Sequence, residues 1–122
     1  MASLFAEFLA ELVGGVSGAI GAIIQDWEGE TVDHFGHLDE MELLINAAQW
    51  GLIWRMFRFQ SSDGRLQAIR EILIETTQQK ILITTLFDDY YLVLLMKKNT
   101  NLAEAVNTIS EVSVFIRREM GL

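Results

Sequence analysis

Apolar positions near the start of the chain follow first a helical and then a strand-like spacing. Residues 3–13 are predicted to form a helix, because their apolar side chains fall on one face. Residues 19–26 form a smooth apolar run that is typical of a buried strand. A tight turn with Gly29 at its end leads into a second predicted strand, residues 30–35. The first quarter of the chain therefore predicts a helix followed by a hairpin.

A strong helix start signal follows this hairpin. Asp39 is a favourable N-cap residue, and Glu42 stands three residues later, which is the spacing of a capping box. The helix is predicted to run to about Phe59 and to end at residues 61–64, where serine, aspartate and glycine cluster.

Three further strands are predicted in the second half. Residues 66–77 form a long strand in which charged and apolar positions alternate along part of the length. Residues 80–87 and 90–97 form two more strands, joined at residues 88–89. Both alternation sets of the last two strands are apolar, so both of their faces must be covered.

A final helix and the order of elements define the predicted fold class. Asn101, with Glu104 three residues later, caps this helix. The order αββαβββα predicts an α+β (α/β) domain in which helices cover each side of a sheet. The length of 122 residues predicts one domain spanning residues 1–122.

Charge and composition narrow the classes of partner. The chain has 17 acidic and 9 basic residues, for a net charge of −8, which disfavours nucleic acid and anionic membrane surfaces. Its longest uncharged stretch, residues 12–25, is shorter than the roughly 18 residues of a membrane span, so no membrane insertion is expected. There is no cysteine, and Glu7 and Glu11 stand where a signal peptide would carry basic residues. We expect a cytoplasmic protein.

The middle helix carries two apolar stripes on nearly opposite sides. One stripe comprises Met41, Ile45, Ala48, Leu52, Met56 and Phe59, and the other comprises Leu43, Ala47, Trp50, Trp54 and Phe57. Only one stripe can pack on the sheet. Leaving a large apolar side chain in water costs roughly 1.5–3 kcal/mol, and aromatic residues are favoured interface anchors. The tryptophan-bearing stripe is therefore predicted to be an interface, and Leu52 to face the sheet. The alternative is a helix that is buried on all sides.

Arg55 and Arg58 border the tryptophan-bearing stripe. They are candidates for a partner contact, and the alternative is that they form a solvated seam of the helix.

The residues offer no recognisable catalytic arrangement. There is no GxxxxGK[ST] loop, and the glycines of residues 14–21 do not match GxGxxG. His34 and His37 lie near two aspartates, but a strand end that leads into a helix cap ordinarily holds such residues. Two histidines in one short segment support no Ser/His/Asp triad. We expect a non-enzymatic protein that needs no cofactor and no metal.

Several phrases in this order of elements resemble the roadblock / dynein light-chain family. Residues 18–30 are similar to the family's first hairpin, and residues 70–75 to its alternating third strand. Residues 89–95, followed by residues 99–103, are similar to its last strand and the start of its last helix. The likeness covers nearly the whole chain, although Ala103 stands where the family usually has glycine.

The resemblance implies a five-stranded antiparallel sheet with the first and last helices on one face and the middle helix on the other. It also implies dimers in which the third strands, here with Ile72 and Ile74, pair edge to edge and the middle helices lie side by side. Family members regulate or anchor small Ras-like GTPases, and a bacterial gliding-motility member is a GTPase-activating protein. The resemblance therefore implies a regulator of such a GTPase that forms homo- or heterodimers, and we expect a homodimer. A structural adaptor without effect on nucleotide turnover, and a small-ligand sensor, remain alternatives.

Overall fold

The computed structural model describes residues 4–61, 69–87 and 90–121, and of residues 58–61 it describes the backbone. The elements are α1 (Leu4–Gly15), β1 (Ala19–Asp26), β2 (Thr31–Gly36), α2 (Glu40–Ser61), β3 (Glu71–Glu75), β4 (Gln79–Phe87), β5 (Tyr90–Lys97) and α3 (Leu102–Glu119). This order confirms the predicted αββαβββα pattern. The bounds of β1 and β5 agree with the predicted strands, and α2 begins one residue after its predicted cap.

The five strands form one antiparallel sheet in the order β2-β1-β5-β4-β3. The central strands β1, β5 and β4 are largely buried on both faces, as their continuous apolar runs predict. β3 lies at one edge and alternates between exposed and half-buried side chains. Ile72 and Ile74 pack toward α2, whereas Glu71, Leu73 and Glu75 point to the other side.

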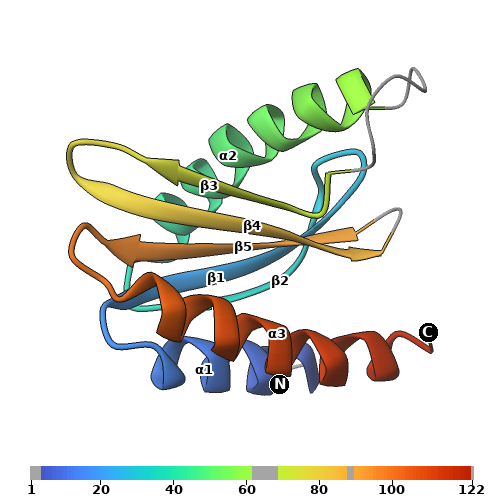
Figure 1. The fold of residues 1–122 in the computed structure, drawn as a ribbon. Coiled ribbons are helices and arrows are strands. Elements are labelled where there is room, and N and C mark those ends of the chain that lie inside the picture. The colour runs from blue at the N-terminus through green and yellow to red at the C-terminus, as the bar shows by residue number, and fades with distance from the viewer. Residues whose placement is uncertain (1–3, 62–68, 88–89, 122) are drawn as a thin grey trace.

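The helices cover the sheet as the resemblance implies, with α1 and α3 side by side on one face and α2 on the other (Figure 1). Two separate cores result. Between the sheet and the α1–α3 pair lie Leu9, Leu12, Ile24, Leu82, Leu94, Ile109 and Ile116, among other buried residues. Between the sheet and α2 lie Ile23, Leu43, Ala47, Trp50, Trp54, Ile81, Ile83, Tyr91, Val93 and Leu95. We call the second set the α2 core.

Local hydrogen bonds fix the starts of two helices and the first hairpin. The Asn101 side chain accepts a hydrogen bond from the Glu104 backbone N–H at 3.1 Å, and Asp39 caps α2 through the Glu42 N–H at 2.9 Å. In the β1–β2 turn, Gly29 has a φ of +88°, a conformation that side chains other than glycine rarely adopt. These contacts confirm the predicted caps and turn.

The third strand is shorter than residues 66–77, the predicted range. It ends at Glu75, because the Thr76 hydroxyl accepts hydrogen bonds from the backbone N–H groups of Gln78 and Gln79 and turns the chain there. Residues 66–68 of the predicted strand and the predicted turn at residues 88–89 lie outside the described residues.

Candidate functional site

The inner side of α2 is its tryptophan-bearing side, and it faces the sheet. Leu43, Ala47, Trp50 and Trp54 are 0–6% exposed and belong to the α2 core. The prediction that these four residues form a partner interface is therefore wrong. They are unavailable to a partner in the folded chain.

Two features explain why the tryptophans can be buried here. The indole N–H of Trp50 donates to the Asn46 side chain one helical turn away, at 3.3 Å, so its polar atom has a partner. The Trp54 ring lies against the Tyr91 ring of β5, with centroids 5.7 Å apart. Large aromatic side chains bury the most apolar area, so the stripe that holds them gains the most from the core.

Glycines in the strands show how closely the inner side approaches the sheet. Gly21 and Gly36 are cross-strand partners on β1 and β2. A Cβ atom on Gly36 would lie 3.2 Å from the Leu43 side chain, and one on Gly21 would come closer still. The small residues of the hairpin therefore make room for Leu43.

The outer face of α2, which we define as Met41, Ile45, Ala48, Leu52 and Met56, is the exposed stripe. Its four large side chains are 55–68% exposed, and Ala48 is exposed as well. The prediction that Leu52 faces the sheet is therefore wrong as well, because its side chain is exposed. The sequence resolves the two stripes but not which of them is buried.

A network of polar side chains lies along one edge of the inner side of α2. The buried hydroxyl of Tyr91 donates to Gln25 Oε1 at 2.6 Å and accepts from Arg55 Nη1 at 3.0 Å. Burial raises the pKa of Tyr91, and the nearby Arg55 charge opposes this shift while Asp26 adds to it. Gly51 lies over the network, since a Cβ there would clash with Gln25 and stand 2.6 Å from the Tyr91 hydroxyl.

Arg55 thus has a structural place between α2 and the first hairpin. Its guanidinium also lies against the backbone of Gly29, where a Cβ atom would clash with it. It is half-buried. This position does not fit a simple solvated seam, and the partner contact of Arg55 stays a prediction.

The other predicted interface residues have mixed positions. Phe57 is 47% exposed near the end of α2, so its interface role stays a prediction. Ile72 and Ile74 are half-buried against the α2 core on the edge strand, and their role in strand pairing also stays a prediction. The side chain of Arg58 lies outside the described residues.

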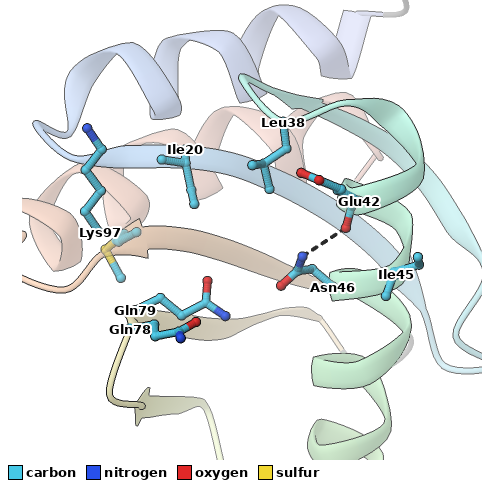
Figure 2. Close-up of a pocket in the computed structure, with 9 residues that line it drawn as sticks. Ile20, Leu38, Glu42, Ile45, Asn46, Gln78, Gln79 and Lys97 are labelled. Atoms are coloured by element: carbon cyan, nitrogen blue, oxygen red, sulfur yellow. Dashed lines mark hydrogen bonds between the residues drawn. The ribbon is translucent and has the colours of Figure 1, made fainter.

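A shallow pocket of about 430 Å³ adjoins the outer face near the start of α2. Figure 2 shows Ile45, Glu42 and Asn46 on the helical side of the pocket and Gln78 and Gln79 opposite them, at the β3–β4 turn. Ile20, Leu38, Met96 and Lys97 complete its wall. Ile45 belongs to both features, so the pocket and the outer face form one continuous surface with apolar and amide groups.

His34 and His37 were considered as metal ligands, and the structure shows other contacts for both side chains. His34 Nε2 lies 3.5 Å from Glu40 Oε1, and the His37 ring contacts Phe35 edge-on. Within residues 4–61, 69–87 and 90–121, no group of three or more histidine, aspartate or glutamate side chains is arranged to hold a metal. No helix in these same ranges is long and apolar enough to cross a bilayer.

Comparison with known proteins gives a likeness of fold. No protein-family model and no curated protein sequence matches the chain. A Roadblock/LC7 domain from Streptomyces avermitilis superposes with a TM-score of 0.85 at 16% identity, over 96% of this chain and 98% of the other. The gliding protein MglB from Thermus thermophilus superposes with a TM-score of 0.80 at 15% identity, over 97% of this chain and 92% of the other. A structure described as MglB with a tetrameric arrangement superposes with a TM-score of 0.81 at 15% identity, over 100% of this chain and 96% of the other.

These neighbours match nearly the full length of the chain in fold, at only 15–16% sequence identity. The chain therefore has the Roadblock/LC7 fold.

Proposed function

We propose that this chain is a dimeric, non-catalytic protein-binding module of the cytoplasm that regulates or anchors a small Ras-like GTPase. The observation that carries the proposal is the outer face of α2. It exposes four large apolar side chains in one stripe on a helix that is already seated on its own sheet. Such a patch on a small chain is typical of a protein interface.

Self-association uses this face together with the edge of the sheet. Among the described residues, no strand lies on the outer side of β3, and an open edge is a template for pairing. A two-fold axis perpendicular to the sheet would place β3 beside its copy and both α2 helices on the same side of the joined sheets. The dimer implied by the family resemblance has this arrangement.

Charge on β3 makes the helices the main source of affinity. An antiparallel pairing centred on Leu73 would set Glu71 opposite Glu75 of the second copy, and like charges across strands are unfavourable. Burying the outer face contributes roughly 1.5–3 kcal/mol for each large side chain that is fully covered. The strand edges then set the register, and the helices supply the stabilisation.

A GTPase partner is supported by the likeness to the gliding protein MglB and by the sequence resemblance to regulators of small GTPases. Two α2 helices side by side would present a platform, and the pocket beside Ile45 would give it a recess for a side chain of the partner. In this role the chain needs no nucleotide site of its own. It would act through the conformation of the GTPase it holds.

The test is a pull-down with the product of a neighbouring gene that carries a GxxxxGK[ST] motif, loaded with GDP or with a non-hydrolysable GTP analogue. We expect capture that depends on the nucleotide and is lost in Ile45→Asp. A matched control, Asn107→Asp, adds the same charge on α3 and should leave capture unchanged. Hydrolysis rates measured with and without the chain then separate a regulator from a scaffold. Absence of capture in both nucleotide states would contradict the GTPase proposal.

A further inference from the structure

A second pocket lies on the opposite side of the sheet from α2, between α3 and the β3–β4 edge. Its volume is about 540 Å³. It is lined by Arg70, Glu71, Thr84, Thr85, Ser110, Ser113, Val114 and Arg117. Only Val114 is apolar, which sets this pocket apart from both cores.

The lining concentrates positive charge in an acidic chain. Two of the nine basic residues of the chain line it, Arg70 and Arg117, against one carboxylate, Glu71. Within the described residues neither arginine has an ion pair. Two free guanidinium groups beside one pocket are suited to a bidentate contact with a carboxylate or a phosphate.

The third charged residue is already engaged. Glu71 accepts a hydrogen bond from the Thr84 hydroxyl at 3.2 Å, across the register pair that these residues form between β3 and β4. Its carboxylate would repel a bare anion at close range and favour a ligand that also carries hydroxyl or amine donors. A ligand that adds such donors to its phosphate or carboxylate group should therefore bind more tightly than the oxyanion alone.

A buried hydroxyl that lacks a hydrogen-bond partner is an independent indication that this pocket holds a ligand. Ser113 is only 3% exposed, and its Oγ is buried without any hydrogen-bond partner in the described structure. It lies on the α3 wall of the pocket, one helical turn or less from Ser110 and Arg117. A buried polar atom without a partner costs free energy that a bound acceptor would recover.

We propose that this pocket binds a small polar molecule through a phosphate or carboxylate group. Arg70 and Arg117 hold the oxyanion, and the hydroxyls of Ser110 and Ser113 donate to it. Glu71 and Thr85 contact the rest of the molecule. The site goes beyond the proposed docking function and lies on the other face of the sheet, so the two are separable by mutation.

The test is a titration of the full chain followed by two-dimensional ¹H–¹⁵N NMR, with sodium phosphate in one arm and sodium acetate in the other, at constant pH and ionic strength. We expect saturable shifts at Thr84, Thr85, Ser110 and Ser113. Saturation with phosphate alone assigns a phosphate site, and saturation in both arms assigns a general oxyanion site. Shifts in neither arm, or shifts that never saturate, would overturn the proposal.

Matched variants separate binding from general charge effects. Arg117→Gln should weaken binding by about tenfold or more, because it removes a charge-assisted contact. Arg118→Gln removes the same charge from the next residue, which lies over the Phe115 ring and not in the pocket. It should change the affinity by less than about twofold. Equal weakening by the two variants would mean that the anion senses only net charge, and the site would be rejected.

Discussion

The two sides of α2 are both apolar, but one is buried and the other is exposed. The inner side is sealed on the sheet, whereas four large side chains of the outer face remain more than half exposed. Both sides look equally apolar in sequence. The inner side differs because it carries two large aromatic rings, and each has a partner within the chain. Trp50 donates a hydrogen bond to Asn46, and the Trp54 ring packs against Tyr91.

The helical spacing of apolar residues therefore identifies two apolar sides of α2, but it does not tell which side packs on the sheet. Aromatic side chains are enriched both in protein interfaces and in cores. In this chain the stripe with the most apolar area packs on the sheet, and the aliphatic stripe stays exposed. The interface that we propose therefore lies on the outer face of α2.

The largest expected effect is on stability. Trp54→Ala should destabilise the chain by roughly 3–5 kcal/mol, because it opens a cavity in the α2 core. Leu52→Ala on the outer face should change stability by only about 0.5 kcal/mol. Urea unfolding at a concentration too low for association measures both. Equal losses would mean that the two sides are not distinct.

A smaller effect is expected at Gly51, which tests how tightly the inner side is seated. Gly51→Ala forces a methyl group onto Gln25 and the Tyr91 hydroxyl and should cost roughly 1–3 kcal/mol. Gly14→Ala is the control, because a Cβ at this helical position meets nothing within 4 Å. It should stabilise the chain by roughly 0.5–1 kcal/mol. Thermal unfolding of both variants tests this, and stabilisation by Gly51→Ala would contradict the seating of α2.

The buried network predicts a weaker, pH-dependent effect. Burial raises the pKa of Tyr91 in the folded chain, so the folded state holds the phenolic proton more tightly than the unfolded state does. This contribution is fully present below the unfolded pKa of about 10 and is lost as pH rises through the folded pKa. Unfolding free energies measured across this range should fall more steeply in the native chain than in Tyr91→Phe. Identical slopes would contradict the buried position of the hydroxyl.

The smallest expected effect concerns salt. Each copy carries a net charge of −8, and β3 places Glu71 and Glu75 at the proposed junction. Screening should therefore strengthen self-association modestly as NaCl is raised, because the contact is apolar and the repulsion is electrostatic. Light scattering across a salt series measures this. Association that weakens steadily with salt would indicate that ion pairs rather than the outer face hold the copies together.

Much of the fold could be predicted from local signals. The Asn101 and Asp39 caps and the Gly29 turn depend on neighbours in sequence, and all three are confirmed. β3 ends before the predicted Thr77, because the Thr76 hydroxyl turns the chain at a point that carries no glycine or asparagine.

The candidate site could be predicted only in part, because it depends on contacts between distant segments. The Gln25–Tyr91–Arg55 network joins residues 66 and 36 positions apart, and its members carry no motif. The glycines Gly21 and Gly36 are the signal that could have indicated the inner side. They mark the place where Leu43 approaches the hairpin.

The most direct test of the central claim is sedimentation equilibrium of the native chain, Leu52→Asp and the control Asn107→Asp at matched concentrations. We expect a mass of twice 13.8 kDa for the native chain and the control, and the mass of a monomer for Leu52→Asp. A native chain that remains monomeric at high concentration, or a Leu52→Asp variant that still forms the native dimer, would contradict the claim that the outer face of α2 is the interface.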